Sequence, residues 1–451
     1  MSVVGFAGSL LVFVASFVLS FIVLAYRSRV FPSVRSTIDR WQRWATGRPD
    51  WSWLRLWHIM VPLTLITAGN VAWNVSSAHC SDDSFAILAS GQAALGGHDP
   101  FSVTFCSHAT STVIPYGLAA VSLNALGALS GTILGIWLVW QLLALAVVPL
   151  VWGIAGESRR YVSVLTATSV LYLPNIATNL GVENLVVAVS VLLMLYALGA
   201  TRRGGTWLQG VAAFLSTARF PALFPLLGSS ASLGRRRGYQ VVLVLGVFLG
   251  SAALAWALWG WDAIQVVYLG QFARANSESL NLFALLIHEG WVEPSLTVAA
   301  VQGAGLLAFV LFANVRGYSP AAACAVPLVG VMIFSQYLNY HFVAWLIPLV
   351  LLGATVNWWL FAYATLAAVN ESFFYWYLAL VRGVWWPYEL SGILLLAISI
   401  VILIVIVRDE EARLGPRTRT GQDTARGSHR TARDEPTAPS SENRKGTDAP
   451  L

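Results

Sequence analysis

GTILGIWLVWQLLALAVVPLVWGI, residues 131–154, is long enough to cross a lipid bilayer and contains no charged side chain. A helix needs about 20 consecutive apolar residues to cross a hydrocarbon core of roughly 30 Å. The rest of the chain has the same character, because 57% of its 451 residues are hydrophobic and only 11% are charged. Soluble domains carry roughly 25% charged residues. The sequence therefore predicts an all-α, polytopic integral membrane protein.

Similar apolar blocks recur along the chain and predict a bundle of about 11–13 transmembrane helices. We expect spans near residues 4–26, 57–73, 131–154, 161–178, 184–200, 239–259, 296–313, 319–334, 342–356, 358–371 and 388–407. The first block is longer than the apolar core of a secretory signal, roughly 7–15 residues, so we interpret it as a retained span. Two shorter apolar runs, 206–216 and 219–232, lie between arginine clusters and predict a short-helix hairpin with both ends on one side.

Charged residues alternate between the two sides that these spans define. One side has most of the arginines: Arg27, Arg29, Arg35, Arg40, Arg43, Arg48, Arg55, Arg159, Arg160, Arg202, Arg203, Arg235, Arg236, Arg237 and Arg316. The positive-inside rule assigns that side to the cytoplasm. We therefore expect a multi-pass cell-membrane protein whose N-terminus and acidic loops are extracytoplasmic. The net charge of +6 is scattered through short loops, so no nucleic-acid partner is expected.

The chain is expected to form one membrane domain, residues 1–407, followed by a tail. Within it, residues 1–56 supply an additional N-terminal span and a basic cytoplasmic loop, and residues 74–130 form the first large outer loop. The tail, residues 408–451, mixes both charge signs with Pro, Ser, Thr and Gly and has almost no large apolar residue. Such a segment cannot bury enough surface to order itself, which predicts a disordered cytoplasmic tail.

The outer loop holds the first candidate for chemistry, the adjacent carboxylates Asp82 and Asp83. A carboxylate at this position can act as a general base that accepts a proton from an attacking hydroxyl. The alternative is that the pair caps the helix that follows and favours the positive end of its dipole. Farther along, residues 114–130 are apolar but would break the charge alternation as a span, so we expect an interfacial or re-entrant helix there.

Arg219, in the short-helix hairpin, is the second candidate. An arginine among apolar helices is costly in lipid and usually has a partner, and phosphate oxygens match its guanidinium fork. The alternatives are an arginine that extends to the interface or one paired with Glu183. In the same outer loop as the carboxylates, Cys80 and Cys106 could form a disulfide if that loop faces an oxidising compartment. Two unrelated free thiols are the other interpretation.

Several motifs occur in a characteristic order. Asp83 is followed by SFAILASGQAALGGHDPF and then by PYGLAAVSLNALGALSGTILGIWLVWQLLAL; later come Gly181–Asn184, STARFPALFP, NSESLNLF and SQYLNYHFVAWLIP. In this order they resemble the GT-C glycosyltransferases, most closely glycosyltransferase family 87, the polyprenyl-phosphate-mannose-dependent mannosyltransferases. The resemblance covers about residues 57–356. The chain departs from the family in having Arg219 where a lysine is usual, Glu183 in place of glutamine, and an additional N-terminal span.

The resemblance implies a GT-C-type bundle and an extracytoplasmic, inverting hexosyltransferase, a mannosyltransferase by the family's usual donor. Its donor would be a polyprenyl-phosphate sugar within the membrane lipids, and its acceptor a glycolipid or glycan of the cell envelope. Asp83 would be the catalytic base, with Asp82 as its substitute or as an acceptor or metal contact. The donor phosphate would be held by Arg219, Arg274 and His341. Substrate contacts are expected from Glu183, Asn184, Asn276, Gln336, Asn339 and His98.

No resident cofactor is assigned, and a divalent cation is left open. The sequence has no phosphate-binding glycine loop, HExxH motif, CxxC pair or nucleophile elbow, which disfavours an enzyme that uses a nucleotide sugar or ATP. A different class of function is also compatible with many spans and buried polar residues, namely a transporter or flippase of a lipid-linked or polar substrate.

Overall fold

A computed structural model gives the architecture of the chain. The residues that it describes are 54–77, 83–104, 112–113, 117–156, 160, 162–164, 166–167, 185–199, 205–232, 237–269, 286, 290–293, 296–334, 343–353, 363, 366–367, 369–370, 374, 378–379 and 382–415. Most of these residues are helical, in agreement with the predicted all-α class. The expected span near 4–26 lies outside the described residues, as do most residues of the spans expected near 161–178 and 358–371.

The elements follow in chain order. They are α3 (Leu56–Ser77), α4 (Asp83–Leu95), β1 (Ser102–Val103), β2 (Thr112–Val113), α5 (Leu118–Ala128), α6 (Ile133–Leu145), α7 (Val147–Ala155), α10 (Val186–Gly199), α11 (Gly205–Ser216), η3 (Phe220–Ala222), α12 (Leu223–Gly228), η4 (Ser229–Ser232), α13 (Arg237–Trp259), α14 (Trp261–Ile264), η6 (Gln265–Leu269), α17 (Leu296–Arg316), α18 (Pro320–Phe334), α19 (Val343–Gly353) and α21 (Trp386–Leu414).

Three helices in the described ranges are long and apolar enough to cross a membrane by length and composition: Ile133–Ala155, Gly238–Trp259 and Trp386–Leu414. The first of them exposes Leu134, Leu138 and Leu142 on its outer side. Residues spaced by four lie on the same face of a helix, so these side chains form an apolar stripe. A stripe that faces outward is favourable in lipid and unfavourable in water, which supports association with a membrane.

The centre of the bundle consists of shorter helices that are buried on every side. In α18 all residues from Ala322 to Ile333 are buried, and α10 and α19 are buried along nearly their whole length. Helices that are apolar all round belong in a protein interior or in lipid. Close packing here depends on glycine: a Cβ on Gly228 of α12 would lie 2.1 Å from the backbone oxygen of Ala323 in α18.

The predicted span 131–154 is present as two segments, α6 and α7, that meet at Ala146. Pro149 has no backbone N–H, so it cannot complete the helical hydrogen bond to the carbonyl of Leu145. At the junction itself, the amide of Ala146 lies 3.1 Å from each of two carbonyl oxygens, those of Leu142 and Leu143. The apolar helix nevertheless continues across this point, from Ile133 to Ala155.

Short helices occupy both runs that the sequence predicts for the short-helix hairpin. Its first arm is α11, and its second arm is η3, α12 and η4. The end of the second arm is held near the arginine-rich ends of neighbouring helices. Gln240 Nε2 in α13 donates to Ser229 Oγ at 2.7 Å, and Ser230 Oγ donates to Asn314 Oδ1 in α17 at 3.2 Å.

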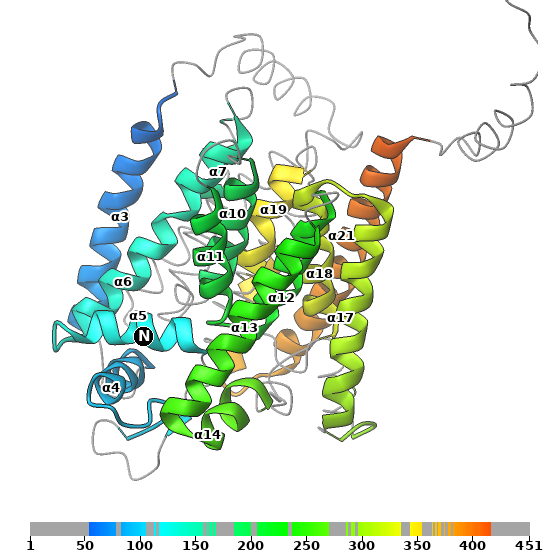
Figure 1. Ribbon diagram of the computed structural model, residues 1–451. Coiled ribbons are helices and arrows are strands. Elements are labelled where there is room, and N and C mark those ends of the chain that lie inside the picture. The colour runs from blue at the N-terminus through cyan, green and yellow to red at the C-terminus, as the bar shows by residue number, and fades with distance from the viewer. Residues whose placement is uncertain are drawn as a thin grey trace, which may run out of the picture.

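Several of the described arginines lie at one end of the bundle. Figure 1 shows α4, α5 and α14 at one end, and the start of α3 and the end of α21 at the other. The second end holds Arg160, which is buried, donates to the Leu54 oxygen at 3.3 Å and lies over the ring of Trp152. Arg55 and Arg316 also lie at the second end, next to Leu56 and in the last turn of α17. These three arginines lie at the same end, and the side of a membrane that this end faces stays a prediction.

At the other end, α5 lies across the bundle rather than along it (Figure 1). With 11 residues it is too short to cross a bilayer, and the interfacial or re-entrant placement expected within residues 114–130 stays a prediction. The sequence does not predict the small antiparallel pair beside it, in which Ser102 is opposite Val113 and Val103 is opposite Thr112. A strand of two residues is too short to show the alternation of apolar and polar side chains by which strands are recognised, so the sequence gives no sign of this pair.

The predicted start of a disordered tail at residue 408 is wrong for its first residues, because α21 continues to Leu414. The reason is a set of long-range contacts that we call the carboxylate clasp: Glu410 and Glu411 of α21 with the corner between α17 and α18. Glu410 accepts from Ser319 N at 2.9 Å and from Ser319 Oγ at 2.6 Å. Glu411 pairs with Arg316 at 3.3 Å.

The clasp also satisfies the groups around it. Arg413 Nε donates to Glu410 at 2.9 Å, and Arg413 Nη2 donates to the Gly317 oxygen at 3.3 Å. Tyr318 is buried in the corner and donates its hydroxyl to Glu411 at 3.2 Å. Burial and this hydrogen bond raise the pKa of Tyr318 to about 12. The hydroxyl therefore stays protonated, as its bond to the carboxylate requires.

Candidate functional site

Asp83, the expected catalytic base, is the first residue of α4. The sequence predicts that a helix begins at or just after the Asp82–Asp83 pair, and α4 begins there. A carboxylate in the first turn is stabilised by the positive end of the helix dipole. The position of Asp83 therefore also fits the alternative interpretation, in which the pair caps the helix. Asp82 lies outside the described residues.

Helix α4 packs closely on α5 within the described part of the outer loop. A Cβ on Gly91 would lie 2.3 Å from the backbone oxygen of Asn124 and 2.8 Å from the Cβ of Ala128. Only a glycine allows the two helices to approach so closely. Ser90 beside it is fully buried. The loop that carries Asp83 is therefore fixed to α5 by direct helix contact.

Helix α5 in turn docks on the tip of the short-helix hairpin. Gly117, which precedes α5, donates its N–H to the oxygen of Ala218 at 3.0 Å, and the Ala119 N–H donates to Thr217 Oγ1 at 3.3 Å. Arg219 follows Ala218 directly. The start of α5 and the backbone that leads into Arg219 are therefore hydrogen-bonded neighbours.

We expect Gly117→Ala to disrupt this docking. A Cβ at Gly117 would lie 1.7 Å from the backbone oxygen of Thr217, so the two segments must move apart. Overpacking of this kind costs roughly 1–3 kcal/mol. The measurement is the free energy of unfolding in detergent micelles by denaturant titration. The matched control is Gly246→Ala in α13, where a Cβ meets nothing within 4 Å and helix propensity predicts a gain of about 0.5–1 kcal/mol.

Arg219 lies at a change of backbone direction. Its backbone is extended, with φ −140° and ψ 119°, and the 3-10 turn η3 begins at the next residue. The Ala222 N–H donates to the Arg219 oxygen at 3.0 Å. The residue is partly exposed. Since α11 and η3 meet at Arg219, the residue occupies the turn of the hairpin, as expected.

His98, an expected substrate contact, lies in the turn after α4. Its side chain is exposed, and the turn is held by Asp99, whose Oδ1 accepts from the Phe101 N–H at 2.9 Å. Phe101 is buried and meets Trp259 edge to face at 5.5 Å between ring centroids. Gly97 adopts φ +73°, which favours glycine. The Gly-Gly-His-Asp-Pro motif therefore forms the turn that anchors the outer loop to the end of α13.

The remaining expected site residues lie outside the described residues, and their roles stay predictions. They are Cys80, Cys106, Glu183, Asn184, Arg274, Asn276, Gln336, Asn339 and His341. The third cysteine, Cys324, is a buried free thiol in α18. Within the part of the chain that the structure describes, no group of three or more His, Cys, Asp or Glu side chains is arranged to hold a metal ion.

The sequence interpretation missed a set of buried polar side chains on α5 and α6. Asn124 accepts from Trp140 Nε1 at 3.2 Å, while Asn124 Nδ2, Gln141 Nε2 and Trp137 Nε1 are buried without a hydrogen-bond partner. Ser90 Oγ of α4 is buried in the same way. The sequence shows these positions, because Asn124 and Gln141 interrupt long apolar runs. Polar residues inside membrane helices are costly and are commonly functional.

Comparisons with protein-family models, with curated proteins and with solved structures find no match to this chain.

Proposed function

We propose that the protein is an extracytoplasmic hexosyltransferase, of the mannosyltransferase type, that uses a polyprenyl-phosphate sugar as donor. An acceptor hydroxyl of a cell-envelope glycolipid or glycan attacks the anomeric carbon, and its proton passes to the carboxylate of Asp83. The bond from the anomeric carbon to the phosphate oxygen breaks, and the polyprenyl phosphate leaves with the electron pair. Attack from the opposite face inverts the anomeric centre.

One observation carries this proposal: the hydrogen bond from Gly117 N–H to the Ala218 oxygen at 3.0 Å. It joins the outer loop, in which α4 begins at Asp83, to the hairpin turn that holds Arg219. The proposed reaction needs an anionic base and a cation for the leaving phosphate on the same side of the membrane. The packing of α4 on α5, and of α5 on the hairpin, gives both residues a common scaffold.

The role of Arg219 follows from the charge of the leaving group. Negative charge accumulates on the phosphate as the glycosidic bond breaks, and cations that are fixed in advance stabilise that charge in the transition state. The guanidinium fork matches two phosphate oxygens. In the proposal Arg274 and His341 supply further positive or donor groups. The apolar outer surface of the bundle supports the choice of a lipid-linked donor, because such a donor reaches the site from within the bilayer.

We expect Arg219→Gln to lower kcat/KM for sugar transfer by about 10²–10³, the effect of removing one donor from a charge-stabilising site. The assay uses membranes that contain the full chain, with polyprenyl-phosphate mannose as donor. Arg219→Lys keeps the positive charge but loses the fork, so it should recover part of the rate. An unchanged rate for Arg219→Gln would remove the residue from the donor site.

A transporter or flippase of a lipid-linked or polar substrate is the second candidate. The observation that favours it is the set of buried, unpartnered polar atoms on α4, α5 and α6, since a polar path through a membrane requires such groups. Movement of a lipid-linked sugar across proteoliposomes in the absence of acceptor would support this candidate. Sugar transfer to acceptor without such movement would support the enzyme.

A further inference from the structure

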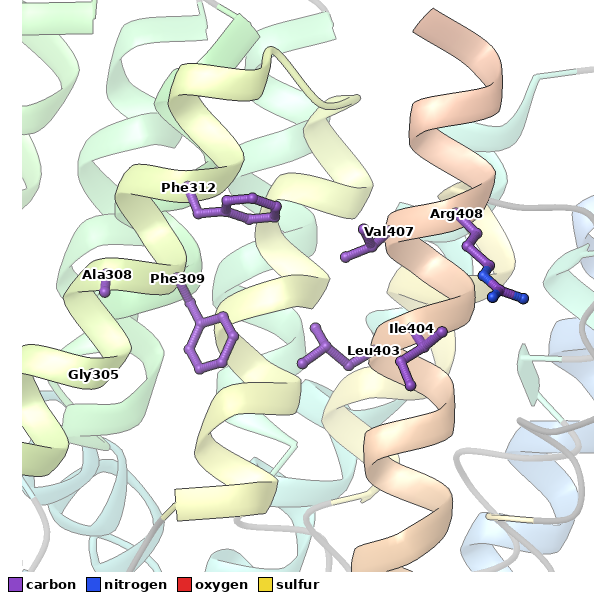
Figure 2. A pocket seen from close by; sticks show the side chains of 8 residues that line it. All are labelled: Gly305, Ala308, Phe309, Phe312, Leu403, Ile404, Val407 and Arg408. Carbon is purple, nitrogen blue, oxygen red and sulfur yellow. The ribbon is translucent and has the colours of Figure 1, made fainter. Parts of the chain in front are cut away.

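A groove lies between α17 and α21 on the outside of the bundle. It has a volume of about 560 Å³ and is lined by Gly305, Ala308, Phe309, Phe312, Leu403, Ile404, Val407 and Arg408. Figure 2 shows the two phenylalanines extending from α17 toward Leu403 and Val407 of α21. This volume falls within the range of roughly 300–1,000 Å³ that is typical of ligand sites.

The groove opens to the outside of the bundle rather than into its core. Ile404 is 47% exposed and Phe312 is 36% exposed, although both are apolar. Helix α21 is one of the helices long enough to cross a membrane. A groove along such a helix faces the acyl chains of the bilayer, because open apolar walls are unfavourable in water. Its occupant should therefore have an apolar chain.

Arg408 is the charged residue among those that line the groove, and it lies at the groove's edge: Figure 2 shows its guanidinium extending from the side of α21 that faces away from the phenylalanines of α17. It lies one turn beyond Ile404 on α21, after the apolar run 390–407. Arg408 is exposed, and no hydrogen bond or ion pair is recorded for it among the described residues. By contrast, the nearby carboxylates Glu410 and Glu411 are occupied by the clasp. Asp409 is exposed beside it. Arginines at the end of a span lie at the level of lipid headgroups.

We propose that the groove between α17 and α21 binds an acidic phospholipid, with one acyl chain against Phe309, Phe312 and Leu403 and its phosphate on Arg408. The site lies at the arginine-rich end of the bundle, away from the end where α4 and α5 lie. It is therefore separate from the proposed sugar-transfer site and does not depend on that proposal. The negative surface of a cytoplasmic leaflet attracts basic groups at this depth.

The test is lipid retention by the full chain, purified in detergent and exchanged with equimolar dioleoyl phosphatidylglycerol and dioleoyl phosphatidylcholine. Native mass spectrometry then counts the bound lipids. We expect the unmodified protein to retain about fivefold more phosphatidylglycerol, the preference typical of one basic residue at a membrane surface. Arg408→Gln should remove the preference. Arg55→Gln is the matched control, since Arg55 is an exposed arginine at the same end but does not line the groove.

Filling the groove tests the acyl-chain part. Gly305→Leu should lower retention of both lipids, because a Cβ at Gly305 meets nothing within 4 Å and the new side chain would occupy the groove. Ala308→Phe, at an exposed position, gives a second filling variant if Gly305→Leu does not yield a monodisperse protein. The proposal is overturned if both arginine variants change the preference equally, or if the filled groove retains as much lipid as before.

Discussion

Asp83→Asn is expected to reduce sugar transfer by about 10²–10⁴, the usual contribution of a general base. The amide has nearly the shape of the carboxylate but cannot accept the proton of the acceptor hydroxyl. Because Asp83 is the first residue of α4, the change should leave the fold intact and the amount of protein in the membrane unchanged. The measurement is the rate of transfer from polyprenyl-phosphate mannose in membranes, normalised to the protein present.

Asp82→Asn is the matched control, since it removes the same charge from the neighbouring residue. A general base at Asp83 predicts a larger loss for Asp83→Asn than for Asp82→Asn, whose residue the resemblance assigns only as a substitute base or as an acceptor or metal contact. If the residue serves only the helix dipole, the loss should appear in stability, with a cost of roughly 0.3–1 kcal/mol, and the transfer rate per folded protein should stay the same. Retained transfer in Asp83→Asn would thus remove the catalytic role from this residue.

The second large effect is expected in the carboxylate clasp, where Glu410→Ala should destabilise the protein by roughly 2–3 kcal/mol. Hydrogen bonds to a charged group contribute about 1.5–3 kcal/mol, and the substitution leaves the Ser319 N–H and hydroxyl without their acceptor. The Glu410 side chain is only 6% exposed, so water cannot replace it easily. Thermal unfolding in micelles gives the overall effect. Hydrogen exchange at the end of α21 shows whether the loss is local.

The next residue on the same helix provides the control. Glu411→Ala also removes a carboxylate, but the Glu411 side chain is 41% exposed and its partner Arg316 is 42% exposed. Exposed ion pairs contribute about 0–1 kcal/mol, because solvent screens them. The variant also removes the single acceptor of the Tyr318 hydroxyl, against the two bonds that Ser319 loses in Glu410→Ala, so we expect the smaller loss for Glu411→Ala. Equal losses for the two variants would mean that the net charge at this end, rather than the buried contacts of Glu410, determines the stability.

Local patterns in the sequence predicted the features that depend on neighbouring residues. The hairpin was expected at 206–216 and 219–232, and the structure has α11 at Gly205–Ser216 and the second arm ending at Ser232. Both boundaries follow from arginines next to apolar runs, which are visible in a short window. The placement of Asp83 at the start of a helix has the same origin.

Features that depend on distant residues were not predictable in the same way. Ser319 and Glu410 are separated by 91 positions, so the segment 408–414 resembles a solvated tail until its partners are known. The docking of Gly117 on Ala218 is similarly remote in sequence. In the candidate site, sequence placed the Asp83 loop and the Arg219 turn on the same side. The backbone contact between Gly117 and Ala218 agrees with that placement, while the roles of both residues remain predictions.

The clasp has a consequence for the order in which the molecule is completed. The ribosome synthesises the chain from its N-terminus onward. Ser319 is therefore made well before Glu410, the carboxylate that accepts its hydrogen bonds. Until α21 has entered the membrane, the junction of α17 and α18 can be hydrated and loose. A chain that stops short of Glu410 would lack the acceptor for the Ser319 N–H and hydroxyl, so we expect this corner to open locally more often than in the full chain.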